Sequence, residues 1–130
     1  MIKTFTDLEV WRTGHQLVLE VYKATNNFPK EELFGLVSQM KRSSASITAN
    51  IAEGFGRRHS KEKEQFYLIS AGSLFELKDQ MLIAKDVGYI NSDIFMELAE
   101  LANKCHAQLN AMLRTHRNNR NSKFENRDSK

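Results

Sequence analysis

Apolar residues recur every three or four positions along most of the chain, the spacing of amphipathic helices. In the first half this pattern predicts one helix from about Asp7 to Asn26 and a second from about Lys30 to Phe55. The first has a face of Leu8, Trp11, His15, Val18, Tyr22 and Thr25. The inner line of the second is Leu33, Val37, Met40, Ser44, Ile47, Ile51 and Phe55.

The same spacing continues in the second half. A third helix is predicted from Ser60 to about Val87, with Phe66, Tyr67, Ile69, Leu74, Leu77, Met81 and Ala84. A fourth, capped by Asn91 or Ser92, has a seam of Ile94, Leu98, Leu101, Cys105, Leu109 and Met112. Pro29, the pair Gly54 and Gly56, and Gly88 separate the segments. Four long helices joined by short turns predict an all-α, up-down-up-down antiparallel four-helix bundle.

The pattern stops after Leu113, where the sequence becomes polar and basic. We therefore expect a bundle domain over residues 1–113 and a frayed or flexible tail over 114–130.

The charge of the chain is unevenly distributed along the sequence. Residues 41–63 hold six bases and two acids, and residues 114–130 again hold six bases and two acids, although the whole chain carries only +3. Basic charge is thus concentrated in the middle and in the tail.

Composition narrows the function classes. With 130 residues and a single cysteine, Cys105, the chain suggests one domain of a reducing compartment in which that cysteine is a small core residue. No apolar run approaches the ~18 residues of a membrane span, and the N-terminus shows no signal-peptide pattern. We therefore expect a cytoplasmic protein without membrane contact. The four histidines lack metal-ligand spacing, so the sequence implies neither a metal site nor a cofactor.

Asn50 and Glu53 lie in a stripe of small residues near the end of the second helix. One interpretation is a polar joint between tightly packed helices, and the other is a catalytic carboxylate. The first is favoured because no second acid or histidine nearby completes an acid/base pair. Gly72, inside the third helix, is expected to pack closely against that stripe, and His15 to be a satisfied core residue. Nucleotide-binding and hydrolase motifs are absent from the sequence, so we expect no enzyme.

The basic residues are the remaining signal. Candidate nucleic-acid contacts are Arg42, Arg57, Arg58, Lys61 and Lys63. Arg57, Arg58 and Lys61 fall at the predicted turn between the second and third helices, where cations can converge on one end of the bundle. Such a cluster is either a solvated surface or a site for phosphates. Arg114, Arg117 and Arg120 of the tail could add to it.

Five stretches of the chain form a recognisable set: Asp7-Leu8…Trp11, Phe28-Pro29…Gly35-Leu36…Gln39, Arg42-Ser43-Ser44…Ser46-Ile47…Asn50-Ile51-Ala52-Glu53-Gly54, Gly72-Ser73-Leu74…Glu76 and Gly88-Tyr89-Ile90. Together they resemble a known bacterial family, the "four helix bundle protein" family, over about residues 5–113. Founding members of this family are encoded in intervening sequences inside large-subunit ribosomal RNA genes. Relatives usually have alanine where this chain has Ser43.

The resemblance implies a four-helix bundle and a homopentameric ring, and it carries over no catalytic residue. It also implies a link to the accessory protein of diversity-generating retroelements, which binds a reverse transcriptase and nucleic acid. In a ring, apolar residues off the inner seams could bury against a neighbouring subunit: Phe75, Leu82, Phe95 and Leu113. Two functions follow: binding of the RNA or DNA backbone through the basic surface, or docking onto a partner enzyme such as a reverse transcriptase without nucleic-acid contact.

Overall fold

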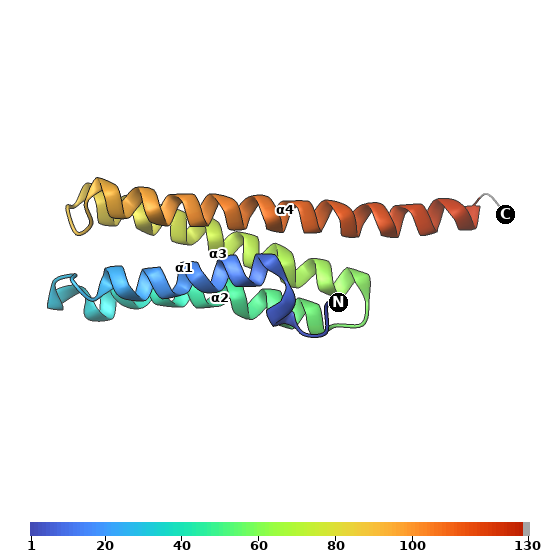
Figure 1. Ribbon diagram of the computed structural model, residues 1–130, viewed down its shortest axis with the longest axis horizontal. Coiled ribbons are helices and arrows are strands. Elements are labelled where there is room, and N and C mark those ends of the chain that lie inside the picture. The colour runs from blue at the N-terminus through green and yellow to red at the C-terminus, as the bar shows by residue number, and fades with distance from the viewer. Residues whose placement is uncertain (129–130) are drawn as a thin grey trace.

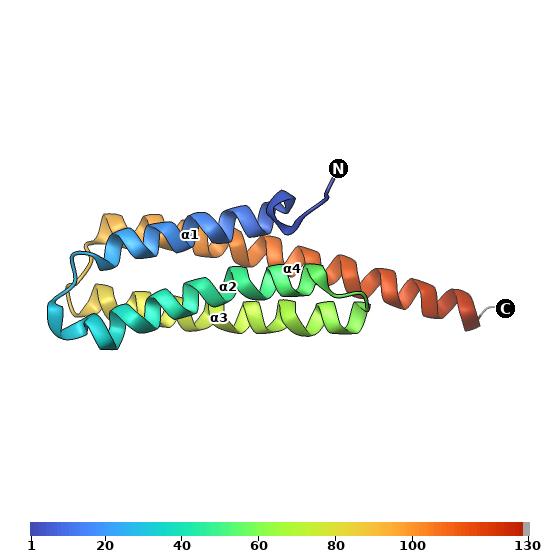
Figure 2. The same cartoon turned by 90° about the horizontal axis from the view of Figure 1, so that it is seen from below.

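The computed structural model describes residues 1–128, with side chains through residue 122, as an antiparallel four-helix bundle (Figure 1). The helices are α1 (Glu9–Thr25), α2 (Ser38–Gly56), α3 (Ser60–Asp86) and α4 (Ser92–Asp128). No strand occurs within residues 1–128. Each helix packs against its neighbours in the chain, and α4 closes the bundle against α1 (Figure 2). The predicted all-α fold is confirmed.

The chain between α1 and α2 departs from the expected single helix beginning at Lys30. A 3-10 turn, Lys30–Glu32, is followed by the segment Leu33–Val37, which is kinked at Gly35, where φ −110° and ψ −111° are not helical. Leu33 and Phe34 precede the kink and lie on the surface, where Phe34 is 93% exposed. Leu33 was expected on the inner line of the helix, so that assignment is wrong.

The turn between α3 and α4 follows the sequence closely. Gly88 has φ +88°, a left-handed conformation that glycine adopts without a steric penalty. The Asn91 side-chain oxygen accepts a hydrogen bond of 2.8 Å from the backbone N–H of Ile94 and thereby caps α4. The glycine stop was predicted and is confirmed, and of the two caps that the sequence allowed, Asn91 and Ser92, the structure has Asn91.

The core lies where the four apolar faces meet. Its largest fully buried side chains include Leu17, Met40, Ile47, Ile51, Leu74, Leu77, Met81, Leu98 and Leu109. Each such side chain stabilises the fold by roughly 1.5–3 kcal/mol relative to leaving it exposed. Cys105 is also fully buried, as expected, and burial raises the pKa of its thiol to about 11. Leu113, expected on an outer surface, belongs to this core instead, because α4 does not end there.

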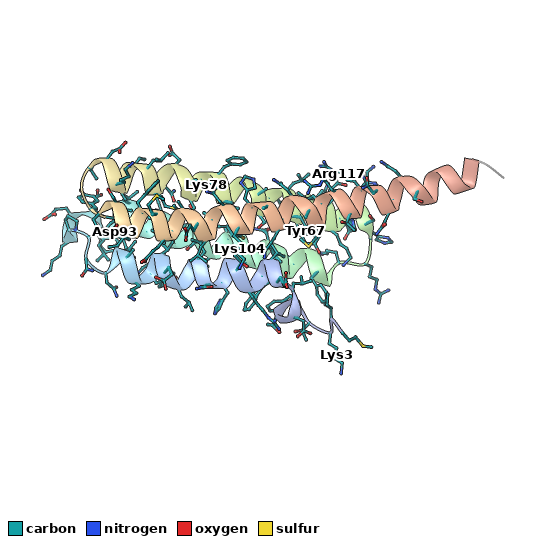
Figure 3. The ribbon with its side chains drawn as sticks, turned by 45° about the horizontal axis from the view of Figure 1, so that its top comes forward. Lys3, Tyr67, Lys78, Asp93, Lys104 and Arg117 are labelled. Carbon is teal, nitrogen blue, oxygen red and sulfur yellow. The ribbon has the colours of Figure 1, made fainter. Side chains whose placement is uncertain are left out.

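Close packing between α2 and α3 occurs at a different glycine from the one expected. An added Cβ at Gly54 would lie 2.5 Å from a ring carbon of Tyr67, so the tyrosine ring, labelled in Figure 3, rests directly on the glycine backbone. At Gly72 an added Cβ would meet nothing within 4 Å, and the residue is exposed. The predicted packing of Gly72 against α2 is therefore wrong, since the residue lies on the outer side of α3.

The last helix continues past the predicted end at Leu113 and runs to Asp128, beyond the turn between α2 and α3 (Figure 1). Its first added turns pack against the start of α3. His116 Nε2 lies 2.6 Å from the Ser60 hydroxyl oxygen, and Arg117 Nε donates to Glu64 at 2.6 Å. Arg120 also pairs with Glu64. The helix therefore does not end at Leu113, and sequence periodicity does not reveal the contacts that extend it. The flexibility expected of residues 114–130 stays a prediction.

Candidate nucleic-acid interface

Three of the predicted contacts lie together at the turn between α2 and α3. Arg57, Arg58 and Lys61 are all exposed there. The Arg57 guanidinium pairs with Glu53 at 3.2 Å and lies over the Phe66 ring, 4.7 Å from its centroid. These contacts hold Arg57 in one orientation. Arg58 and Lys61 take part in no ion pair among the described residues, so their charges are available to a ligand.

Lys63 has a structural contact that the sequence does not show. Its ammonium donates to the carbonyl oxygens of Phe55 at 2.8 Å and Gly54 at 3.2 Å, two acceptors at the C-terminal end of α2. Partial burial lowers the pKa of Lys63. A lysine that satisfies helix carbonyls in this way neutralises the negative end of the helix dipole. Its charge is therefore less available to a phosphate than that of Arg58 or Lys61.

Arg42 lies apart from the turn. Fifteen positions separate it from Arg57 along the helical chain, which corresponds to roughly 22 Å at 1.5 Å per residue. Arg42 is exposed and lines two grooves, one on each side of its helix. The five predicted residues thus form a cluster of three, a capping lysine and a separate arginine.

Glu64 is a residue of this surface that sequence reasoning missed. Hydrogen bonds from Arg117 and then Arg120 hold its pKa below the usual range. Its side chain is well covered, while the two arginines remain partly exposed. Glu64 fixes the added turns of α4 beside the α2–α3 turn and so brings the tail cations to the same end of the molecule (Figure 3). In the sequence Glu64 ends the alternating run Lys61-Glu62-Lys63-Glu64, which does not indicate its distant partners.

The small-residue stripe contains no catalytic arrangement of Asn50 and Glu53. The Asn50 amide donates to the backbone oxygen of Ser46 at 2.8 Å and to its hydroxyl oxygen at 3.0 Å, as expected of a polar residue at a helix joint. Glu53 is exposed, so a buried joint is wrong for this residue, but its predicted pairing with Arg57 is confirmed.

The structure also shows the surroundings of His15 and of the potential metal ligands. His15 is exposed and stacks on Trp11 with ring centroids 4.7 Å apart, so the core assignment of this histidine is wrong. Among the described residues, histidine, cysteine and acidic side chains do not gather in groups of three that could hold a metal ion. The helices described also contain no stretch long and apolar enough to cross a membrane.

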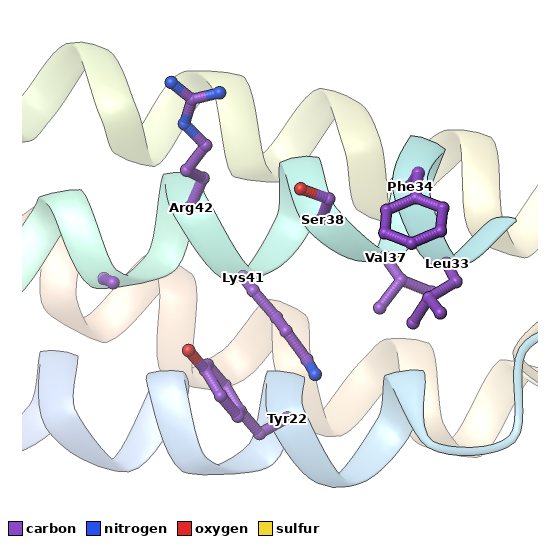
Figure 4. Close-up of a pocket in the computed structure, with 8 residues that line it drawn as sticks. Tyr22, Leu33, Phe34, Val37, Ser38, Lys41 and Arg42 are labelled. Carbon is purple, nitrogen blue, oxygen red and sulfur yellow. The ribbon is translucent and has the colours of Figure 1, made fainter.

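An apolar groove lies between α1 and α2, next to the kinked segment Leu33–Val37 (Figure 4). Its volume is about 470 Å³, and its lining residues are Tyr22, Leu33, Phe34, Val37, Ser38, Lys41, Arg42 and Ala45. The Lys41 ammonium lies 4.8 Å from the centroid of the Tyr22 ring. The groove combines exposed apolar surface with two cations, a combination that suits an apolar segment carrying acidic side chains.

A family model of the 23S rRNA-intervening sequence proteins matches residues 6–111. A similar solved structure is that of a protein with unknown function from the S23 ribosomal protein family of Bacteroides thetaiotaomicron. The two have a TM-score of 0.72 at 18% identity, over 80% of this chain and 97% of that one. At this identity the likeness shows the fold alone. No curated protein matches the chain significantly.

Proposed function

We propose that this chain, which belongs to the 23S rRNA-intervening sequence protein family, is a non-enzymatic, oligomeric protein that binds the backbone of RNA or DNA. The observation that carries the proposal is the gathering of exposed cations at one end of the bundle. Arg57, Arg58 and Lys61 project from the α2–α3 turn, and Glu64 holds the basic turns of α4 next to them. Cations outnumber acids at this end, which favours a polyanionic ligand.

The shape of this surface supports backbone contact rather than base reading. Its cations lie on the outside of a turn and a helix end. A groove beside Arg57 is lined by one aromatic side chain, Phe5, whose ring packs edge-on against Trp11. Phe66 is already covered by Arg57, and Tyr67 is buried. Phosphate contacts fix position on a nucleic acid without reading its sequence. We therefore expect little sequence preference from this end of the molecule.

Oligomerisation is part of the proposal, with a homopentamer favoured by the family resemblance. α3 exposes an apolar stripe at seven-residue spacing, in which Phe75 is 60% and Leu82 is 47% exposed and Leu68 completes the row. Gly72 lies beside this stripe with open space above its backbone. A helix interior glycine costs about 1 kcal/mol relative to alanine, and close approach of a neighbouring subunit would offset that cost. A ring would repeat each basic patch and raise avidity.

Charge reversal tests the proposed function. The double variant Arg58→Glu/Lys61→Glu should bind a labelled structured RNA and a duplex DNA far more weakly than wild type at low salt. Both residues are exposed and make no ion pair in the described chain, so the fold should persist. Lys23→Glu/Lys104→Glu, on exposed sites of α1 and α4, is the control for net charge. Equal weakening by both double variants, or no binding by wild type, would remove the proposal.

The second candidate function is a protein–protein adaptor that docks onto a partner enzyme such as a reverse transcriptase, without nucleic-acid contact. The groove around Phe34 favours it, because Lys41 and Arg42 flank the apolar surface and would pair with acidic side chains of a partner segment. The test is a pull-down from the native host with and without nuclease. If the protein is an adaptor, its protein partner stays bound after nuclease treatment and is lost from the Phe34→Glu variant. If the protein binds nucleic acid, the captured partners are lost after nuclease treatment.

A further inference from the structure

A polar cleft between α2 and α3 is left unexplained by backbone binding. It has a volume of about 480 Å³ and is lined by Gln39, Arg42, Ser43, Ser46, Ser73 and Glu76. These residues come from three of the five stretches on which the family resemblance rests, yet they lie on a different part of the surface from Arg57, Arg58 and Lys61. Only one lining residue is a cation, so the cleft differs in chemistry from the basic end of the bundle.

One of the two hydroxyl protons of Ser46 and Ser73 is not used in a hydrogen bond of the described chain. Asn50 donates to the Ser46 hydroxyl oxygen at 3.0 Å, and that oxygen lies 2.8 Å from the hydroxyl oxygen of Ser73. The Ser46–Ser73 hydrogen bond uses one of the two hydroxyl protons, whichever residue donates. No hydrogen bond of the described chain uses the other. Ser43 is committed elsewhere, because its hydroxyl donates to the backbone oxygen of Gln39 at 2.9 Å. The cleft therefore offers a hydroxyl donor.

Arg42 and Glu76 line the same cleft without forming an ion pair, and Arg42 joins no ion pair of the described chain. One carboxylate oxygen of Glu76 accepts a long hydrogen bond of 3.4 Å from the Gln80 amide, which leaves most of its acceptor capacity free. A phosphate bound by Arg42 would face this carboxylate and be repelled. The cleft is better matched to a neutral group that presents acceptors to the arginine and donors to the glutamate.

We propose that this cleft binds an unpaired guanine base of the nucleic acid, an inference that rests on the proposed function. Guanine places the acceptors O6 and N7 on one side, where an arginine fork pairs with both. Its N1–H and N2–H₂ groups are adjacent donors that a carboxylate accepts together. Adenine and uracil would turn acceptor atoms toward Glu76 on either side of their single donor group. Cytosine offers the carboxylate only its N4 amino group. Bases are read in this way in unpaired loops and ends.

RNA probes in which single atoms or groups of the base are changed test the assignment of the cleft to guanine. The probes are fluorescent RNA hairpins of identical stem, each with one loop position occupied by guanine, inosine, 7-deazaguanine or adenine. Inosine lacks the N2 amino group facing Glu76, and 7-deazaguanine lacks the N7 acceptor facing Arg42. Guanine should bind about 5- to 150-fold more tightly than adenine, the range of a bidentate base contact. Inosine and 7-deazaguanine should fall in between.

Matched variants link each base atom to its residue. Glu76→Gln should abolish the difference between guanine and inosine, and Arg42→Ala should abolish that between guanine and 7-deazaguanine. Lysine is not used at position 42, because it also pairs with O6 and N7 of guanine. Lys104→Ala removes the same charge as Arg42→Ala, is the control, and should leave both differences in place. If all hairpins bind equally, or if Arg42→Ala retains the difference between guanine and 7-deazaguanine, the guanine site is refuted while backbone binding stands. If no hairpin binds even at low salt, the proposed function fails as well.

Discussion

Gly54 is a point of close contact between α2 and α3, and replacing it with alanine should weaken the fold. An alanine Cβ would lie 2.5, 2.8 and 3.1 Å from three ring carbons of Tyr67. The ring is 4% exposed and rigid, so it cannot turn aside as the end of a flexible side chain could. Overpacking of this kind typically costs 1–3 kcal/mol, and a contact at 2.5 Å against a buried ring places Gly54→Ala near the upper end.

Helix propensity opposes this cost. Alanine is favoured over glycine inside a helix by about 1 kcal/mol, and by less near a helix end. Gly54 lies in the last turn of α2, so the net loss should be about 2 kcal/mol. Urea unfolding followed by circular dichroism measures it. With an m-value of about 2 kcal/mol/M, the midpoint should fall by about 1 M.

Gly56→Ala is the matched control. Gly56 is in the same turn, but an added Cβ there meets nothing within 4 Å. This variant should unfold at the wild-type urea concentration or slightly above it, because it gains propensity without a clash. The reasoning is refuted if Gly54→Ala is as stable as wild type, or if both variants lose stability equally, since either result would show that the Tyr67 contact does not determine the outcome.

Three further predictions concern other contacts. Glu64→Gln should fray the added turns of α4, seen as faster amide exchange over residues 114–122, and unchanged exchange in this variant would contradict the role of Glu64. Because hydrogen bonds from Arg117 and Arg120 lower the folded-state pKa of Glu64, wild type should keep this protection through the ordinary titration range of glutamate and lose it only at lower pH. Asn50→Ala should lower the free energy of unfolding by about 1 kcal/mol through loss of its bonds to Ser46; a variant that unfolds like wild type yet binds poorly would make Asn50 functional instead. Phe75→Glu should reduce the mass measured by light scattering toward the 15.0 kDa of one chain, whereas a monomeric wild type would remove the oligomer.

Local sequence signals predicted the fold well where one residue determines the local conformation. Gly88 could be assigned from the end of an apolar repeat, because a left-handed turn there favours glycine. Asn91 could be assigned as a cap because its side chain acts on the same helix. The core line of α2 from Met40 to Ile51 also followed from helical spacing alone.

The features that could not be predicted from the sequence depend on tertiary contacts. The spacing of Gly72 allowed an inward or an outward position, and only packing against α2 decides between them. The extension of α4 depends on His116, Arg117 and Arg120 meeting Ser60 and Glu64, which are more than fifty positions away. The candidate site depends on tertiary contacts in the same way. The sequence shows only a series of basic residues, and the structure is needed to distinguish the exposed Arg58 from Lys63, which caps α2.

The salt dependence of nucleic-acid binding tests the central claim most directly. Affinity for a labelled duplex DNA is measured at several salt concentrations between about 50 and 200 mM, with wild-type protein. Arg57, Arg58 and Lys61 together should neutralise about three phosphates per subunit, and each contributes about −0.9 to the slope of log affinity against log salt. A slope of about −2.5 or steeper is predicted. Binding with a slope near zero, or no binding at 50 mM salt, would contradict the account.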